Sequence, residues 1–164
     1  MAETGAAGRR ADLAAMVVPL GRALVAAELP ILKARQLSMW AYAVLLHLGE
    51  EPVRSQAALA EAIGADKTRI ITVLDDLQAR GLIHRGADPV DRRVRLLSLT
   101  AEGSRLRDAA QSAIQRHEER LLARLSPAQR DGFLSALREL SALPPEVFIA
   151  EADTDTEADP GAQR

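Results

Sequence analysis

The stretch LAEAIGADKTRIITVLDDLQARG, residues 59–81, holds two helical patterns separated by a tight turn. Gly64 ends the first pattern, which Ser55 precedes as an N-terminal capping residue. Asp66 caps the second pattern in the same way, and Gly81 ends it. A short helix, a tight turn and a second helix of about four turns predict a helix-turn-helix motif.

A β-hairpin is predicted directly after this motif. LIHR at 82–85 has a strand pattern, GADPVD at 86–91 is rich in turn residues, and RRVRLLSL at 92–99 is extended in character. A hairpin in this position is a wing. Residues 37–100 are therefore expected to form a winged helix-turn-helix unit.

Two helices are expected after the hairpin. Thr100 is a capping residue for a long helix over about 101–125, whose apolar positions form a stripe. SPAQ at 126–129 is a capping box with proline at the first helical position. A sixth helix therefore begins there, and it is expected to end near Ser141.

Two further helices are expected before the helix-turn-helix motif. The first covers roughly 11–33, and Pro30 is expected to bend or interrupt it near its end. The second covers roughly 39–49, with Ser38 as its cap and Gly49 as its end. The predicted fold is mainly α, with six helices and a small β-hairpin wing.

Length and composition favour a single domain. The 164 residues leave room for one domain, placed at residues 11–142. Residues 1–10 are small and polar, and residues 143–164 are acidic and contain prolines, so both segments are predicted to be disordered. Apolar residues make up 48% and aromatic residues only 2%, which favours a helical core of Leu, Ala, Ile and Val.

The chain contains no cysteine, which excludes disulfides, thiolate zinc sites and cysteine-based redox sensing. This composition is compatible with a reducing cytosol, and a cytoplasmic location is expected. No uninterrupted apolar run reaches about 18 residues, so no membrane-spanning segment is expected. Pro19, Gly21 and Arg22 break the N-terminal apolar segment, which predicts an amphipathic helix rather than a signal peptide.

Charge is distributed unevenly along the chain. Residues 66–95 hold seven basic and five acidic side chains, whereas residues 151–164 hold five acidic side chains and one basic. The formal net charge of −2 for the whole chain therefore masks a mildly basic middle segment.

The second helix of the motif has one side suited to nucleic acid. At about 100° per residue its apolar positions fall on one side, and Thr68, Arg69 and Thr72 fall on the other. In a helix-turn-helix this N-terminal half enters the major groove. Arg69 can read guanine with two parallel hydrogen bonds, and the threonines can reach phosphates or a thymine methyl group. Lys67 and the helix N-terminus favour phosphate.

Asp75 and Asp76 count against this interpretation, because their charges would repel a DNA backbone lying along the whole helix. They are tolerable if only the first two turns of the helix insert into the groove. The alternative is an ordinary amphipathic surface helix with mixed charges.

The wing strengthens the nucleic-acid interpretation. Arginines at its tip could reach a neighbouring minor groove, whose negative potential attracts them. Asp91 lies two residues before Arg93 and can orient its guanidinium by a charge-assisted pair. The alternative is a solvated turn whose charges keep an edge strand soluble.

Three local patterns combine in this region. The helix ends in leucine, three residues and Gly-Leu, the wing contains D-x-R, and the next helix opens with L-T-x-x-G. The residues that carry them are Leu77, Gly81, Leu82, Asp91, Arg93, Leu99, Thr100 and Gly103. This combination, with the six-helix order over about residues 11–142, resembles the MarR family of bacterial winged-helix regulators.

The resemblance implies a homodimer held by the helices at 11–36 and 101–142. It implies binding to a pseudo-palindromic double-stranded operator, usually to repress transcription. In many members a small ligand, bound between the dimerisation helices and the DNA-binding lobe, releases the DNA.

The resemblance also assigns roles to individual residues. Arg93 matches the wing arginine that enters the minor groove, and Asp91 matches its orienting partner. Arg92 is a further phosphate contact. The half of the recognition helix that reads bases and contacts phosphates contains Lys67, Thr68, Arg69 and Thr72.

Trp40 and Tyr42 are the obvious stacking groups for an aromatic ligand, and both lie at the start of the predicted helix 39–49. The alternative role for both is core or dimer packing. His47 and His117 are not part of a cluster with metal-ligand spacing, so no metal or cofactor is expected. The chain departs from the thiol-oxidation sensors of the family because it lacks cysteine.

The expected function is that of a homodimeric, sequence-specific DNA-binding transcriptional regulator. We expect a repressor of neighbouring genes that a small molecule releases, with no membrane partner. The alternative is a winged-helix protein-interaction module without DNA binding. No nucleophile–base motif, phosphate loop or metal signature is found, so an enzyme is not expected.

Overall fold

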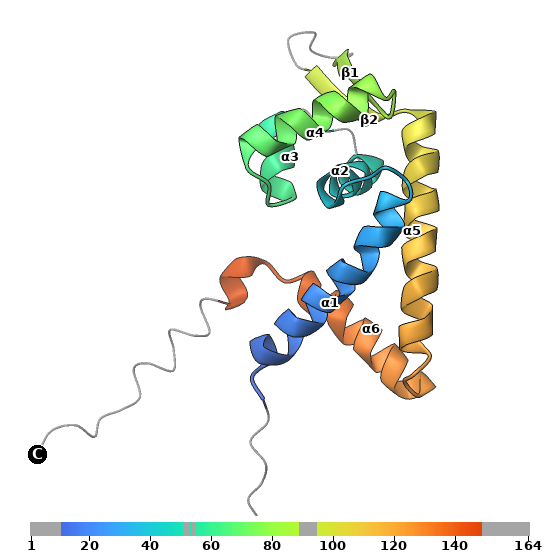
Figure 1. The fold of residues 1–164 in the computed structure, drawn as a ribbon. Coiled ribbons are helices and arrows are strands. Elements are labelled where there is room, and N and C mark those ends of the chain that lie inside the picture. The colour runs from blue at the N-terminus through green and yellow to red at the C-terminus, as the bar shows by residue number, and fades with distance from the viewer. Residues whose placement is uncertain (1–10, 51–52, 54, 89–94, 149–164) are drawn as a thin grey trace, which may run out of the picture. The chain divides into compact units, whose positions relative to one another are not determined.

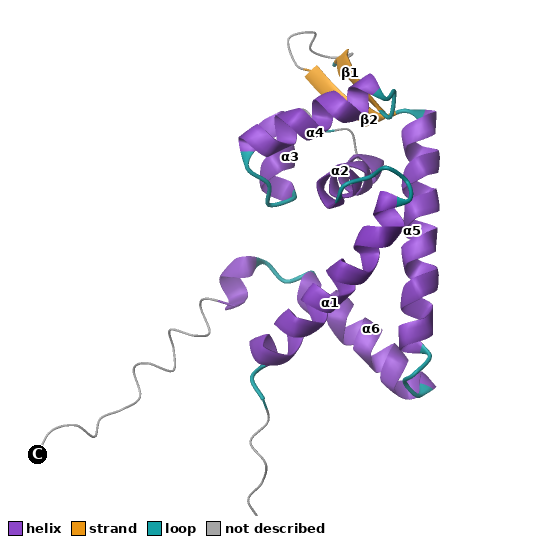
Figure 2. Cartoon of the chain, viewed as in Figure 1, coloured by secondary structure: helices purple, strands orange, loops and turns teal. Residues whose placement is uncertain are grey.

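The computed structural model describes residues 11–50, 53, 55–88 and 95–148. Across these residues the helices and the two-stranded sheet follow one another in the predicted order (Figures 1 and 2). The elements are α1 (Leu13–Lys33), α2 (Met39–Glu50), α3 (Gln56–Ala62), α4 (Lys67–Ala79), β1 (Ile83–Ala87), β2 (Arg95–Leu99), α5 (Ala101–Leu122) and α6 (Pro127–Ser141). The mainly helical fold class with a small hairpin is therefore confirmed.

Contacts divide the chain into two compact units, Met1–Arg116 and His117–Arg164, with the boundary inside α5. The first unit contains α1 to α4, the hairpin and most of α5. The second contains the end of α5 and all of α6. A single domain over residues 11–142 stays a prediction.

The two helices of the helix-turn-helix begin where their capping residues predict. The Ser55 hydroxyl accepts a hydrogen bond from the Ala58 backbone N–H at 3.0 Å, and the Asp66 carboxylate accepts one from the Arg69 N–H at 2.8 Å. Each cap satisfies a backbone donor that has no partner within the helix. The short polar side chains therefore define both helix starts.

The predicted caps of α2 and α6 are also present. The Ser38 hydroxyl accepts a hydrogen bond from the Ala41 N–H at 3.1 Å. Ser126 and Gln129 form the complete capping box at the start of α6. Both starts agree with the sequence because the signal depends only on residues within one helical turn.

Glycine ends both helices of the motif in the left-handed backbone region, with φ of 67° at Gly64 and 69° at Gly81. The Gly81 N–H donates to the Gln78 carbonyl, and the Leu82 N–H donates to the Leu77 carbonyl. These two bonds make a Schellman motif, which satisfies the last carbonyls of α4 and turns the chain toward β1.

The end of α1 has the same hydrogen bonds without a glycine. Gln36 has a φ of 56°, its N–H donates to Lys33, and the Leu37 N–H donates to the Leu32 carbonyl at 3.0 Å. The carbonyl of Gln36 in turn accepts a hydrogen bond from Arg80 Nη1 at 2.8 Å. The α1–α2 connection is thereby linked to the end of α4.

One apolar core holds the first unit together. α4 packs against α2, α3 and β1 (Figure 1). The largest fully buried side chains are Leu32, Val44, Leu45, Leu59, Ile70, Leu74 and Leu77. Because these residues come from α1, α2, α3 and α4, the core fixes α4 on the helices around it.

The hairpin is antiparallel, and its register runs from Ile83 opposite Leu99 to Ala87 opposite Arg95. Val53 adds an isolated antiparallel bridge to Leu97. The predicted turn at 86–91 is therefore placed differently, because the β1 pairing continues through Ala87. The backbone pairing with β2 extends β1 beyond the predicted strand at 82–85, as far as Ala87.

Two helix ends and one expected interruption differ from the sequence prediction, whereas α1 ends at Lys33 as predicted. α1 continues through Pro30 to Lys33 and is not interrupted there. α2 continues past Gly49 to Glu50. The Arg107 side chain lies close to Gly49, and a Cβ added at this glycine would lie 1.7 Å from the Arg107 Nη1 atom. Gly49 thus permits a close approach and does not end the helix. α5 ends at Leu122, before the turn that leads into the next capping box.

The C-terminal segment is partly helical. Residues 145–148 form a helical turn, so the prediction of disorder from residue 143 onward is wrong there. Proline is well tolerated in the first turn of a helix, which explains why the Pro144–Pro145 pair does not prevent it. Residues 1–10 and 149–164, also predicted to be disordered, lie outside the described residues.

Candidate nucleic-acid interface

The outer face of α4 is the candidate interface. Ile70, Leu74 and Leu77 are buried in the core, as the helical periodicity predicts. Thr68 and Thr72 are exposed, one turn apart on the opposite side. Lys67 is the first residue of the helix. The structure therefore separates a core face from a polar face, as expected for a recognition helix.

Arg69 lies at the edge of this outer face and is held by two neighbours. Its Nε atom lies 3.6 Å from the Asp66 carboxylate. Its guanidinium carbon lies over the Trp40 ring, 5.6 Å from the ring centroid. More than half of the Arg69 side chain is still exposed, so it can reach a partner.

The two aspartates that argued against nucleic acid both have cationic partners. Asp75 Oδ1 lies 2.7 Å from Arg85 Nη2, which comes from β1. Asp76 Oδ2 lies 3.2 Å from Nη1 of Arg80, the residue that directly follows α4. Each arginine offsets one negative charge at close range. The outer face of α4 therefore repels phosphate less than its sequence suggests.

The wing tip lies outside the described residues. Asp91, Arg92 and Arg93 are in the segment between the last described residue of the β1 side, Asp88, and Arg95. Ala87 and Arg95 are the paired residues nearest the turn of the hairpin. All three residues therefore follow β1 and precede β2 in the chain. Their proposed contacts stay predictions.

The L-T-x-x-G motif has a clear structural role. The Thr100 hydroxyl donates to the Gly81 carbonyl at 2.7 Å and accepts from the Gly103 N–H at 3.0 Å. A Cβ at Gly103 would lie 1.9 Å from the Leu82 carbonyl oxygen. Thr100 and Gly103 therefore join the end of the recognition helix to the start of α5 at close range.

The two aromatic residues predicted for ligand stacking have different environments. Tyr42 is only 6% exposed and belongs to the hydrophobic core. Trp40 is half-buried and contacts Arg69. Residues two apart in a helix do not face each other, so the two rings cannot enclose one ligand. The burial of Tyr42 agrees with the core-packing alternative, and its role in ligand binding stays a prediction.

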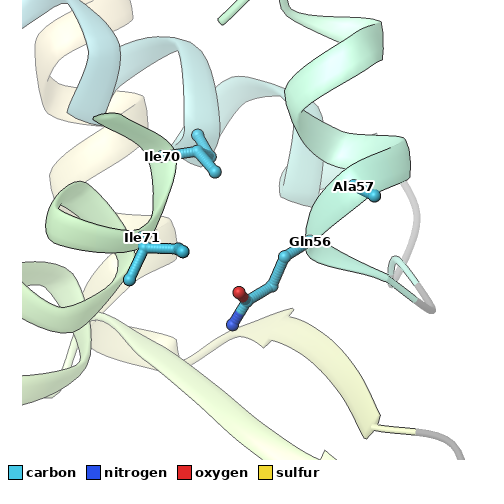
Figure 3. A pocket seen from close by; sticks show the side chains of 4 residues that line it. All are labelled: Gln56, Ala57, Ile70 and Ile71. Carbon is cyan, nitrogen blue, oxygen red and sulfur yellow. The ribbon is translucent and has the colours of Figure 1, made fainter. Parts of the chain in front are cut away.

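An open hollow of about 210 Å³ lies between the starts of α3 and α4, lined by Gln56, Ala57, Ile70 and Ile71. Figure 3 shows the Gln56 amide and the Ile71 side chain extending into the space between the two helices. Neither Trp40 nor Tyr42 lines this hollow. It is therefore a different place from the predicted aromatic ligand site.

Three features of the interface were not predicted from the sequence. Ile71 is 47% exposed on the recognition helix, next to the outer face. Arg85 pairs with Asp75, and Trp40 pairs with Arg69, each across two elements. The exposure of Ile71 follows from the helical period, which places it beside Thr68 at the edge of the outer face. The two pairings depend on tertiary packing, so sequence spacing carries no signal for them.

No three His, Asp or Glu side chains in the described part of the chain are grouped so that they could hold a metal ion.

A family model described as MarR family matches residues 35–94, the segment from the end of α1 to the wing. The transcriptional regulator HosA of Escherichia coli O111:H- is 34% identical over 99 residues, which are 60% of this chain and 73% of HosA. The chain belongs to the MarR family.

Further comparisons place this MarR-family chain beside two other proteins. A Thauera aromatica protein, whose name links it to transcriptional regulation of the hcr operon, is 34% identical over 99 residues. These are 60% of this chain and 60% of that protein, less than two thirds of its length.

A solved structure of the MarR family protein Rv2887 of Mycobacterium tuberculosis, in complex with p-aminosalicylic acid, has a TM-score of 0.70 and 26% identity. The match covers 80% of this chain and 100% of Rv2887. The complex of Rv2887 with DNA matches with a TM-score of 0.68 and 26% identity, over 81% and 100% of the two chains.

α1 is the one described helix that is long and apolar enough to cross a membrane, by length and composition alone. The sequence predicted no membrane-spanning segment, because no uninterrupted apolar run reaches about 18 residues. Core helices of soluble proteins and signal sequences near an N-terminus have the same length and composition. The exposed large apolar residues of α1 are Leu13, Met16, Val17, Val18, Leu20, Val25 and Leu29.

Proposed function

We propose that this MarR-family chain is a transcriptional regulator that binds double-stranded DNA at a specific operator. The observation that carries the proposal is the outer face of α4, where Thr68, Arg69 and Thr72 are exposed in the N-terminal half. Asp75 and Asp76, farther along, are offset by Arg85 and Arg80. The DNA complex of the related Rv2887 supports this proposal.

The first two turns of α4 would enter the major groove. Arg69 would donate two parallel hydrogen bonds to a guanine, and Thr68 and Thr72 would contact phosphates or a thymine methyl group. Lys67 would contact phosphate at the start of the helix. The rest of α4 would leave the groove, which reduces the repulsion between its acidic residues and the DNA backbone.

The wing would make the second contact with DNA. Arg93 would enter the adjacent minor groove, with Asp91 orienting its guanidinium, and Arg92 would contact phosphate. These roles rest on the resemblance to the family and on the placement of residues 91–93 between the two strands.

We also propose that the regulator is a homodimer, formed by the helices at 11–36 and 101–142. Large apolar side chains are exposed on α1, and on α6 Phe133, Leu137 and Leu140 are 41%, 48% and 50% exposed. In a chain that folds in aqueous solution, exposed apolar surface of this extent indicates a protein–protein interface. A dimer would match the two halves of a pseudo-palindromic operator.

A small-molecule effector would release the DNA, and the regulator would act in the cytoplasm as a repressor of neighbouring genes. The complex of Rv2887 with p-aminosalicylic acid supports an effector of small aromatic type. Trp40 remains the aromatic side chain that such a ligand could reach, because Tyr42 is in the core. Catalysis is no part of the proposed function.

Footprinting on the DNA that flanks the gene for this chain tests the proposal. A protected, roughly two-fold symmetric site is expected, and its affinity should fall steeply with salt because phosphate contacts release counterions. The same footprint should be lost in the presence of an effector, and small aromatic acids are the first compounds to test. If the chain is instead a protein-interaction module, no footprint is expected, or the affinity for DNA should not change with salt concentration.

A further inference from the structure

We infer that Trp40 is a positioning residue for Arg69, and that its ring holds the guanidinium ready to read a base edge. The inference rests on the proposed function and assigns to α2 a part in sequence recognition. Neither the DNA-reading set predicted on α4 nor the wing includes any residue of α2.

The geometry brings two elements together at one side chain. Trp40 lies at the start of α2 and Arg69 in the first turns of α4, and these two helices pack against each other. The Arg69 guanidinium carbon is 5.6 Å from the centre of the Trp40 ring. This is within the distance of about 6 Å at which a cation is attracted to an aromatic face.

Asp66 holds the same arginine from a second side. One carboxylate oxygen caps the helix by accepting from the Arg69 N–H at 2.8 Å. The other oxygen lies 3.6 Å from Arg69 Nε. Because Asp66 is itself fixed by the cap, Arg69 is held between an ordered carboxylate and the ring of a half-buried tryptophan.

The Asp66 contact is made at Arg69 Nε, so the Nη1 and Nη2 groups are the donors that would read a base edge. A guanine is read by two N–H groups of one guanidinium. The Arg69 side chain is 55% exposed in this arrangement. A long side chain loses conformational freedom when it binds, and a side chain that is already ordered loses less. Trp40 should therefore favour binding at the operator.

An ordinary packing role for Trp40 predicts something different. The ring would then support the fold, and its loss would weaken DNA binding whether or not residue 69 is an arginine. The positioning role requires that the effect of Trp40 disappear when Arg69 is absent. A double-mutant cycle separates these two roles.

The first experiment tests the contact in the free protein. Trp40 is the only tryptophan of the chain, so its fluorescence reports on this one site. Arg69→Ala should expose the ring face and shift the emission to longer wavelength, while Thr72→Ala on the same helix should not. Identical emission spectra for wild type and Arg69→Ala would overturn the inference.

The second experiment measures binding to the footprinted operator and to random DNA of equal length. Trp40→Leu should weaken operator binding about three- to tenfold, the range set by a cation–π contact, and leave binding to random DNA unchanged. Trp40→Phe, which keeps an aromatic face, should recover most of the affinity. In the Arg69→Ala background, Trp40→Leu should have no further effect.

The outcomes distinguish the inference from the proposed function. A wild-type chain that protects no DNA contradicts the proposed function, and the positioning role fails with it. A wild-type footprint together with equal losses from Trp40→Leu in both backgrounds overturns the positioning role alone. If Trp40→Leu does not fold by circular dichroism, Trp40→Met, which keeps an apolar side chain without an aromatic face, takes its place in the same cycle, and the fluorescence comparison of wild type with Arg69→Ala still tests the contact.

Discussion

Arg85 on β1 lies with its Nη2 atom 2.7 Å from the Asp75 carboxylate on α4, so the wing and the recognition helix are joined by an ion pair. Arg85 is the more buried partner, with 24% of its side chain exposed against 58% for Asp75. The carboxylate that seemed to oppose DNA binding thus connects the two elements proposed to contact DNA. The same pair offsets its charge where phosphates would approach.

Arg85→Ala should therefore weaken operator binding by about 1 kcal/mol, because Asp75 would face the phosphates uncompensated and the wing would lose a link to α4. The effect on the free energy of unfolding should be small, on the order of 0–1 kcal/mol, since solvent reaches the pair at the exposed Asp75 carboxylate and screens it. Gel shifts measure the first quantity and thermal unfolding the second.

The matched control removes the carboxylate as well. In the double variant Asp75→Asn with Arg85→Ala, the uncompensated charge is gone and most of the affinity should return. If the double variant binds as weakly as Arg85→Ala, the charge of Asp75 is not the cause of the loss.

Gly103→Ala should destabilise the protein by about 1–3 kcal/mol, the scale of an overpacked core position. The new Cβ would lie 1.9 Å from the Leu82 carbonyl oxygen, which is backbone and cannot rotate away. Denaturant unfolding measures the loss. The control is Gly132→Ala within α6, where nothing in the described part of the chain lies within 4 Å of the added Cβ apart from the backbone of α6 itself.

This control should stabilise the protein by roughly 0.5–1 kcal/mol, because alanine restricts the unfolded chain more than glycine does. Opposite signs for the two substitutions are the expected result. Equal effects would mean that the close approach of α5 to Leu82 is not present in solution.

The features that sequence predicted best are local ones. Helix caps and glycine ends depend on residues within one turn, so the sequence predicts them directly. The examples are the caps at Ser55 and Asp66 and the helix ends at Gly64 and Gly81. Gly49 shows the limit of this reasoning. It has the position of a helix end, yet α2 continues to Glu50, and the Arg107 side chain from α5 lies against Gly49.

The contacts that sequence could not predict join distant residues. Trp40 and Arg69 belong to different helices, and Asp75 and Arg85 to a helix and a strand. Their spacing in the chain has no regular period, because the packing of α2, α4 and β1 brings them together. The sequence predicted the residues of the outer face of α4. It did not predict that Trp40 contacts Arg69 or that Arg85 pairs with Asp75.

Gln36→Gly should stabilise the protein by up to about 1 kcal/mol. Gln36 has a φ of 56°, and a residue with a Cβ is strained in this left-handed region. Its carbonyl accepts the hydrogen bond from Arg80, and a glycine retains that acceptor. The rise in melting temperature measures the gain.

Gln36→Ala is the control for the side chain itself. Alanine keeps the strain, so it should change the free energy of unfolding by less than about 0.5 kcal/mol. An equal gain from alanine and glycine would show that the glutamine side chain, rather than the backbone, opposes folding.

Arg93→Ala should weaken operator binding by about 1–3 kcal/mol, the scale of one good base-edge contact, while the dimer stays intact. Arg92→Ala is the matched control from the adjacent position. As a phosphate contact, Arg92 should contribute equally on operator and random DNA, and its loss should reduce the salt slope by about one. Gel shifts at several salt concentrations on both DNAs separate the two roles. Wild-type affinity for Arg93→Ala would show that the wing arginine does not enter the minor groove, and the wing would then contact DNA through phosphate alone.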